Sequence, residues 1–443
     1  MSDPTTTGTT PVLPVKNPRD ARRAALGSYL GATLEYYDFV LYSTASALVF
    51  PAVFFSQVDP ATGVVLSFLT LAVGYVVRPL GAILFGHFGD RLGRKKMLIV
   101  TMVLMGVASV GIGIVPSGAQ VGPAAALVLV ALRAVQGVAV GGEWAGASLM
   151  AMEHATARRR GLAGSIVASG GPSGAVLATL VFSLVSLMPA EDLLAWGWRI
   201  PFLASAVILV VALVVRAGVR ESPEFTAVRD RRDTVRVPLV ATLAQNWRSV
   251  LVIVLCALAP FFAQSVTATF GLRYAVANGN DQAAVLAMLT VSNLLTIVAT
   301  IGSAALSDRF GRRPTMLVGY VAGGSLAWAA LALLTVPNIG AVLLAFVILQ
   351  PIVNATIAGP LAAFMAELFP VRTRFTGVGL SYQLASTLAS GFAPLVATAL
   401  VAASGGTTTL LATIMSVLAL AGVVATLAAR RLRVEDAAPP VAP

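Results

Sequence analysis

Apolar runs long enough to cross a lipid bilayer follow one another along nearly the whole of this 443-residue chain. A transmembrane helix needs about 20 such residues, so twelve spans use roughly 240–280 residues. Hydrophobic residues make up 57% of the chain and charged residues 11%, with a mean hydropathy of +0.87, whereas soluble domains carry about 25% charged residues. The sequence therefore predicts an all-α, multi-pass membrane protein.

The runs and the polar segments between them predict twelve transmembrane helices. These spans are expected at 26–53, 63–87, 97–116, 122–152, 161–188, 197–217, 249–275, 283–306, 315–336, 340–366, 376–402 and 407–428.

Basic residues indicate how the spans are oriented. Most of the 30 lysines and arginines fall in the two tails, the central stretch 216–248 and alternate short connections. The intervening loops hold Asp59, Glu191, Asp192 and Asp281, and no basic residue. The positive-inside rule then places both termini and the central loop on the cytoplasmic side. The expected location is the inner (plasma) membrane of a cell. Topology alone accounts for the net charge of +11, so no nucleic-acid partner is expected, although contact with anionic lipids is.

Several chemistries lack the residues that they need. Cys256 is the only cysteine, and His87 and His154 have no cysteine or carboxylate at ligand spacing. An intrachain disulfide is excluded and a metal site is not expected. A nucleophile–base constellation and a GxxxxGK[ST] loop are also missing, so we expect neither an enzyme nor ATP as the direct energy source.

Two features repeat in the halves of the chain. GHFGDRLGRKK follows the second predicted span and SAALSDRFGRR follows the eighth, and the spacing of Glu153 and Arg160 returns in Glu367 and Arg374. This predicts a duplicated six-helix unit. The expected organisation is a cytoplasmic tail (1–25), an N-terminal six-helix bundle (26–217), a cytoplasmic linker (218–248), a C-terminal six-helix bundle (249–428) and a second cytoplasmic tail (429–443).

The first of these loops resembles the signature loop of the major facilitator superfamily, and the second resembles its echo. The segments LEYYDFVLY, RAVQGVAVGGEWAGA, WGWRIPFL, RESPEF and AELFPVRTRFTG are similar to those of the metabolite:proton symporter family within it. The resemblance runs from about residue 27 to 400. It implies two six-helix bundles, and a substrate among small carboxylates and zwitterions such as shikimate, 2-oxoglutarate, citrate, proline and betaine.

The resemblance also implies a conformational gate. In the superfamily, the residues matching Asp90 and Arg94 brace helices and lock the gate closed on the cytoplasmic side, with Glu153 as a partner. The second copy departs from the pattern at Ala304, which stands where the first has Gly86. The residues expected to form the gate are Gly86, Asp90, Arg91, Gly93, Arg94, Glu153, Arg160, Asp308, Arg309, Gly311, Arg312, Glu367 and Arg374.

Five charged side chains lie deep inside predicted spans, away from the span ends: Glu35, Asp38, Arg78, Arg133 and Glu143. Each costs roughly 2.5–3.5 kcal/mol at mid-bilayer unless it is paired, hydrated or functional. Glu35 and Asp38 share a helix face because they are three residues apart, and Arg133 is expected at the same depth as Glu35. Asp38 with Arg133 is the predicted proton-coupling pair and Glu35 the second candidate. The alternative is a static ion pair that fixes helix packing.

The other two charges are interpreted differently. Arg78 is expected to support the nearby loop from a position about two turns inside the cytoplasmic end. Glu143 follows Gly141 and Gly142, which permit close helix approach, and is expected to pack there and contact the gate.

Substrate binding is assigned to Arg133 and to neutral polar residues in the spans. Any one of these neutral residues alternatively makes an interhelical hydrogen bond or fills a packing gap. Arg273 is expected near the outer mouth, where it attracts an anion. The predicted substrate-binding residues are Arg133, Tyr37, Gln136, Gln264, Thr267, Asn354, Tyr382 and Gln383.

The predicted function is proton-coupled uptake of a small organic acid or zwitterion by a monomer in the bilayer, without a cofactor other than the coupling proton. Drug efflux by antiport is disfavoured because GGPSGAV at 170–176 lacks the closing glycine pair of such antiporters. The C-terminal tail is too short for the heptads of an osmosensing carrier. A proton-independent facilitator and a non-transporting receptor stay open as alternatives.

Overall fold

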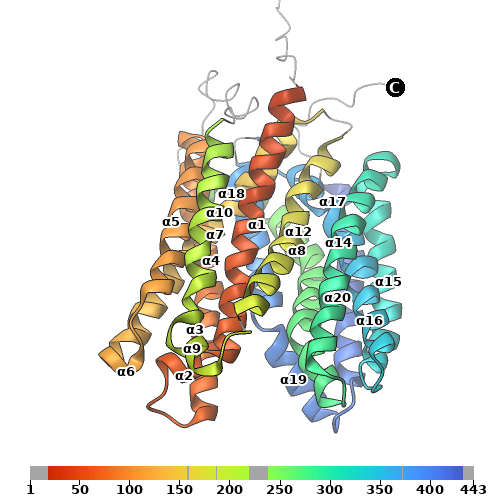
Figure 1. The fold of residues 1–443 in the computed structure, drawn as a ribbon. Coiled ribbons are helices and arrows are strands. Elements are labelled where there is room, and N and C mark those ends of the chain that lie inside the picture. The colour runs from red at the N-terminus through yellow and green to blue at the C-terminus, as the bar shows by residue number, and fades with distance from the viewer. Residues whose placement is uncertain (1–17, 157–158, 186, 219–237, 372, 433–443) are drawn as a thin grey trace, which may run out of the picture.

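The computed structural model describes residues 18–156, 159–185, 187–218, 238–371 and 373–432, and these ranges form helices and short connections without a strand (Figure 1). The elements before residue 219 are α1 (Pro18–Leu48), α2 (Phe50–Phe54), α3 (Pro60–Val76), α4 (Arg78–Leu92), α5 (Arg94–Ile114), α6 (Gly118–Val121), α7 (Ala124–His154), α8 (Arg160–Val185), α9 (Ala190–Asp192), the π-helical turn η2 (Leu193–Gly197) and α10 (Arg199–Ala217).

The later elements include three more π-helical turns, η3 to η5, and a 3-10 turn, η6. They are α12 (Pro238–Ser265), η3 (Val266–Gly271), α13 (Leu272–Ala277), α14 (Gln282–Phe310), α15 (Arg312–Leu333), α16 (Ile339–Val347), η4 (Ile348–Asn354), α17 (Ala355–Ala366), α18 (Arg374–Ser386), η5 (Thr387–Gly391), α19 (Ala393–Ala403), α20 (Thr409–Ala428) and η6 (Ala429–Arg431).

Ten helical stretches among the described residues are long and apolar enough to cross a membrane. They coincide with ten of the predicted spans, so the all-α membrane fold is confirmed. The remaining two predicted spans, 26–53 and 376–402, are helical as well, in α1 with α2 and in the run α18–η5–α19. In the second of these, the helix is interrupted at Phe392, and α19 has only 11 residues.

Residues at the helix ends explain where the helices begin and end. The side chains of Asp59 and Asp281 each accept a hydrogen bond from a backbone N–H in the first turn of α3 and α14, at 3.0 and 2.8 Å, which caps the helix. At the other end, α4 and α14 stop at Gly93 and Gly311, with φ of 110° and 98°. Glycine adopts such angles without steric cost, so the glycine of the repeated motif forms the turn, as the sequence predicts.

The predicted linker differs in part from the structure. α12 begins at Pro238, inside the predicted linker 218–248, and bends at Asn246, where φ is −123°. A short helix therefore leads into the following apolar span. Residues 1–17, 219–237 and 433–443 lie outside the described residues, and the predicted domain boundaries stay predictions.

The helices gather in two groups, α1–α10 and α12–α20, which lie side by side (Figure 1). Between the groups, α8 packs on α14 and α17, and α18 packs on α4 and α7. The largest hydrophobic cluster belongs mainly to the second group but takes in Trp144, Leu149 and Met152 of α7. The two groups therefore share a core near the end at which α1 begins.

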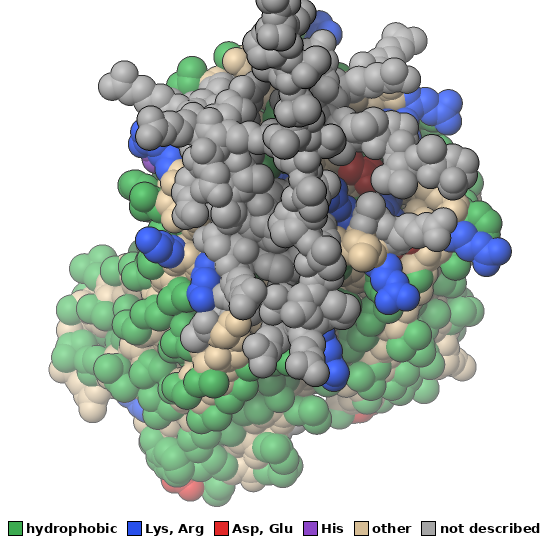
Figure 2. Space-filling model, turned by 90° about the horizontal axis from the view of Figure 1, so that it is seen from above, with side chains coloured by type: hydrophobic (Ala, Val, Ile, Leu, Met, Phe, Trp, Pro, Cys, Tyr) green, Lys and Arg blue, Asp and Glu red, His purple; other side chains and the backbone are tan. Residues whose placement is uncertain are grey.

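Exposed arginines and lysines surround that end, which we call the basic end, whereas the sides of the molecule are largely hydrophobic (Figure 2). Leu127, Val207 and Val298 on the sides are 70%, 68% and 71% exposed, as expected of helices that face lipid. The exposed basic residues of this end include Arg91, Lys96, Arg159, Arg248, Arg309 and Arg430.

Candidate functional site

A hydrogen-bonded chain links the carboxylate of Asp38 to Arg133 inside the first helix group. Asp38 is 2% exposed, and its two carboxylate oxygens accept from Ser205, at 2.5 Å, and from Ser109. Ser109 accepts from the Gln136 amide nitrogen at 2.7 Å, and Gln136 Oε1 accepts from Arg133 Nη1 at 3.0 Å. Asp38 and Arg133 are thus connected through Ser109 and Gln136 rather than by an ion pair among the described contacts, and their role as a proton-coupling pair stays a prediction.

The guanidiniums of Arg133 and Arg78 both lie close to one aromatic ring, that of Phe39. The carbon at the centre of each guanidinium is 5.4 and 5.1 Å, respectively, from the centroid of Phe39. Each arginine also covers a tyrosine, Tyr42 for Arg133 at 4.2 Å and Tyr75 for Arg78 at 4.3 Å. Such cation–π contacts stabilise a guanidinium away from water.

The expected position of Arg78 near the cytoplasmic end is wrong. α3 and α4 form one long helix interrupted only at Val77, because Pro79 in the first turn of α4 lacks a backbone N–H. Arg78 is thus roughly 21 Å from the end of α4 at 1.5 Å per residue, near the middle of the span. It is 7% exposed and shares a cavity with Arg133.

Two more carboxylates are buried close to this cavity. Glu35 and Glu143 are 4% and 0% exposed. Gly141 and Gly142, beside Glu143, permit the close helix approach that the sequence predicts: a Cβ on Gly141 would lie 2.2 Å from the carbonyl oxygen of Arg78.

The cavity itself has a volume of about 10 Å³, which is room for about one water molecule. Its lining comes entirely from the first helix group. The lining residues are Glu35, Asp38, Phe39, Gly74, Arg78, Met105, Arg133, Gln136, Gly137 and Val140.

Tyr382 and Gln383 of α18 reach across to the first helix group. The ring of Tyr382 stacks on Trp144 with the centroids 3.6 Å apart, and its hydroxyl lies 3.5 Å from that of Tyr36. The Gln383 amide nitrogen donates to the carbonyl oxygen of Val140 at 3.3 Å. Both predicted residues therefore lie at the interface between the groups, next to residues that line the cavity.

The other predicted polar residues of the second group lie apart from this cavity. Asn354 donates to Gln350 at 2.9 Å, and Gln350 donates to the backbone oxygen of Gln264 at 3.4 Å. Thr267 donates to Ala263 in its own helix. Thr267, Gln350 and Asn354 lie in π-helical turns, which are rare and frequent at functional sites.

Tyr37 does not line the cavity, in contrast to the prediction. Its side chain is fully buried, and its hydroxyl donates to the carbonyl oxygen of Pro201 at 2.8 Å. Successive residues of a helix point about 100° apart, so Tyr36 faces the second group while Tyr37 packs on α10. Ser109, Ser205 and Phe39 were not predicted, because single serines and phenylalanines in an apolar helix give no signal.

Acidic residues join the two groups at the basic end. Asp308 of α14 accepts hydrogen bonds from the backbone N–H groups of Gly161 and Leu162, at 3.0 and 2.9 Å, at the start of α8. A carboxylate at a helix N-terminus is favourable. Arg312 contacts Asp308 and lies 3.4 Å from Glu367.

Glu153 and Arg374 form a second link, an ion pair of 3.4 Å between α7 and α18. A Cβ on Gly86 would lie 3.0 Å from Thr376 of α18, so the two groups touch closely here. Arg160 starts α8 and lies close to this interface.

Two residues predicted to form the gate, Arg91 and Arg309, make contacts within their own helices. Arg91 lies 3.1 Å from His87 of its own helix, and Arg309 covers the ring of Phe310 at 5.3 Å. The side chains of Asp90 and Arg94 lie outside the described part of the structure.

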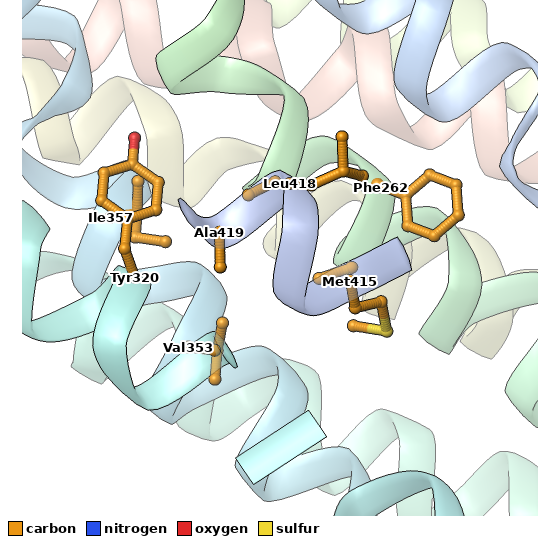
Figure 3. A pocket seen from close by; sticks show the side chains of 10 residues that line it. Phe262, Tyr320, Val353, Ile357, Met415, Leu418 and Ala419 are labelled. Atoms are coloured by element: carbon orange, nitrogen blue, oxygen red, sulfur yellow. The ribbon is translucent and has the colours of Figure 1, made fainter. Parts of the chain in front are cut away.

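A second cavity of about 10 Å³ lies within the other helix group (Figure 3). Phe262, Tyr320, Val353, Ile357 and Met415 surround it. It is apolar and lacks charged residues, which is typical of a packing gap. Among the described residues, no group of three or more histidines, cysteines and acids is placed to hold a metal ion.

Comparison with known proteins identifies a family to which the chain is similar. The model of the Major Facilitator Superfamily matches residues 29–320 and 257–443. The shikimate transporter of Escherichia coli K12 is 39% identical over 385 residues, 86% of this chain and 88% of the relative. The proline/betaine transporter of Salmonella typhimurium LT2 is 31% identical over 396 residues, 86% of this chain and 78% of the relative.

Solved structures show the same fold. The proton:xylose symporter XylE bound to 6-bromo-6-deoxy-D-glucose has a TM-score of 0.72 and 20% identity, over 94% of this chain and 96% of that one. The inward-open conformation of XylE from E. coli gives a TM-score of 0.61 and 19% identity, over 93% and 96%.

Proposed function

This chain belongs to the major facilitator superfamily, and from that premise we propose that it imports a small organic acid or zwitterion together with protons. It is a multi-pass transporter of the inner membrane and not an enzyme. We propose three things beyond this: that protons are the coupling ion, that the substrate is an organic acid or zwitterion, and that transport is inward.

The proposed topology has twelve spans in two bundles of six, with both termini in the cytoplasm. The exposed arginines and lysines of the basic end support this orientation, because basic residues are retained on the cytoplasmic side. We therefore take the basic end as cytoplasmic. Residues of one chain line the whole cavity, so we expect the monomer to transport.

The proposed mechanism is alternating access. The contacts of Asp308 with α8 and of Glu153 with Arg374 hold the two bundles together at the basic end. The stacked Trp144 and Tyr382 add a further contact between the bundles near the cavity. These contacts must separate before a substrate is released to the cytoplasm.

The chain from Asp38 through Ser109 and Gln136 to Arg133 is the observation that carries proton coupling. Arg133 stays charged, whereas Asp38 gains a proton when the site opens outward and loses it when the site opens inward. A protonated Asp38 holds Ser109 less strongly, and Gln136 then holds Arg133 less strongly. Arg133 becomes free to bind a substrate anion, so proton and substrate bind together. Glu35 is the second candidate for the proton.

The substrate class is supported by the buried arginines and by the relatives, which are named as transporters of shikimate and of proline and betaine. No cofactor is proposed apart from protons. Export by drug:proton antiport and proton-independent facilitation are the competing functions.

Uptake into proteoliposomes tests this proposal. We expect labelled shikimate, 2-oxoglutarate, citrate, proline or betaine to accumulate when the outside is made acidic, and a protonophore to abolish the accumulation. Uptake that is unchanged by the gradient indicates a facilitator. Uptake driven by the opposite gradient indicates an antiporter.

A further inference from the structure

We propose that the carboxylate of the transported molecule binds between Arg78 and Arg133, and that Glu35 accepts a hydrogen bond from a hydroxyl or ammonium group of the same molecule. This inference rests on the proposed import of an organic acid or zwitterion. It narrows the substrate to a carboxylate that carries a hydrogen-bond donor nearby.

Arg78 has hydrogen-bonding capacity that the protein does not use. Its side chain is 7% exposed, and its Nε atom is buried without a partner in the described part of the chain. The rings of Tyr75 and Phe39 hold the guanidinium in position. Buried polar groups are nearly always hydrogen-bonded, and an arginine offers five N–H donors in a planar fork that matches a carboxylate.

Arg133 lines the same cavity and also lies close to the ring of Phe39. It is 3% exposed and donates through Nη1 to Gln136, while its Nε atom has no partner among the described residues. Gly74 lets the guanidinium approach α3, because a Cβ at that position would lie 2.5 Å from Arg133 Nε. Two guanidiniums with unused donors thus converge on a single cavity.

Glu35 supplies the complementary acceptor. It lines the same cavity and is 4% exposed, and its Oε2 atom is buried without a hydrogen-bond partner in the described ranges. The oxygens of Asp38, in contrast, are already engaged by Ser109 and Ser205. Glu35 is therefore the carboxylate left to contact a ligand.

The arrangement discriminates between ligand chemistries. A simple anion satisfies the arginines but leaves Glu35 facing a like charge without a donor. A quaternary ammonium such as that of betaine carries no N–H and cannot donate to Glu35. A hydroxy acid or an amino acid satisfies both ends. The cavity of about 10 Å³ is closed in this conformation, so binding requires the bundles to part.

Equilibrium binding to the purified full-length protein tests the inference. The ligands are shikimate, shikimate methyl ester, proline, betaine, citrate and 2-oxoglutarate. The variants are Arg78→Gln, Arg78→Lys and Glu35→Gln. The matched control is Arg248→Gln, which removes an exposed arginine outside the cavity.

We expect wild type to bind shikimate or proline, and to bind betaine and the ester at least tenfold more weakly. Loss of a charge-assisted pair predicts binding that is roughly 10- to 100-fold weaker in Arg78→Gln, a smaller loss in Arg78→Lys, and no change in Arg248→Gln. Glu35→Gln keeps an acceptor oxygen but loses the negative charge. It should therefore weaken the binding of proline, which has an ammonium group, more than the binding of shikimate, which has hydroxyl groups.

Two results overturn the inference. One is equal affinity of Arg78→Gln and wild type for the bound acid. The other is wild-type affinity for betaine or for the ester that matches the affinity for proline or shikimate, a comparison that holds even if Arg78→Gln does not fold. If wild type binds none of the six compounds and accumulates none, the proposed function itself fails.

Discussion

Asp308 offers the sharpest test of how the two bundles are held together at the basic end. It lies on α14 of the second bundle, but its carboxylate accepts from two backbone N–H groups of α8 in the first, at 3.0 and 2.9 Å. Replacing Asp308 by alanine removes both hydrogen bonds and the negative charge at the N-terminus of α8. The substitution therefore weakens the closed arrangement, and within the second bundle it removes the contact of Asp308 with Arg312.

The size of the effect follows from these contacts. Hydrogen bonds to a charged group are worth about 1.5–3 kcal/mol each. Water replaces part of this when the bundles separate, although the Asp308 side chain is only 10% exposed in the closed arrangement. A net loss of about 2–3 kcal/mol changes the ratio of open to closed molecules by roughly 30- to 140-fold.

Labelling of an introduced cysteine measures this ratio. Ala362 is 1% exposed and faces α8, where a Cβ on Gly164 would lie 3.2 Å from its own Cβ. Ala362→Cys is placed in a Cys256→Ser background, which removes the one native thiol. A membrane-permeant maleimide should label the Asp308→Ala protein at least tenfold faster.

The control is Asp281→Ala on the same helix. Asp281 caps α14 within its own bundle, by accepting from Ala284 at 2.8 Å. Its loss should lower the melting temperature slightly and leave the labelling rate unchanged. If Ala362→Cys is labelled at the same rate with and without Asp308→Ala, and both proteins are folded, Asp308 does not hold the two bundles together.

Two further outcomes are expected. Ser109→Ala breaks the link between Asp38 and Gln136 and should lower proton-driven accumulation at least tenfold in an uptake assay. Ser205→Ala removes the other hydrogen bond of Asp38 and should lower accumulation less. Similar accumulation by the two variants contradicts the coupling path. Tyr382→Ala removes a stacked ring pair worth about 0.5–1.5 kcal/mol and should raise proton-independent efflux from loaded vesicles several-fold, while Tyr382→Phe, which keeps the ring, should not.

The sequence predicts the helices well because apolar length and charge placement act locally. The two copies of the DRxGR motif, at 90–94 and 308–312, show this most clearly, since Gly93 and Gly311 form the turns for which a glycine is needed. The buried charges were also visible, because an acid or arginine in an apolar run is costly and rare.

The contacts between those charges were beyond the sequence. The depth of Arg78 depends on where its helix ends, since α4 continues to Leu92, five residues past the predicted end of the span at residue 87. The link between Asp38 and Arg133 depends on Ser109, which lies on a third helix, α5, and on Gln136, one turn from Arg133 on α7. Tyr36 and Tyr37 are adjacent residues of the same type, so the sequence does not distinguish them. The orientation of α1 about its axis decides which of them faces the second bundle.

Proton movement on addition of substrate tests the central proposal most directly. Proteoliposomes in a weakly buffered medium, without an imposed gradient, receive the acid or zwitterion that wild type accumulates, and a pH electrode follows the medium. Symport predicts that the medium becomes alkaline as substrate enters, and that Asp38→Asn abolishes this signal while retaining exchange of labelled for unlabelled substrate. Substrate entry without a change in the pH of the medium would contradict proton coupling.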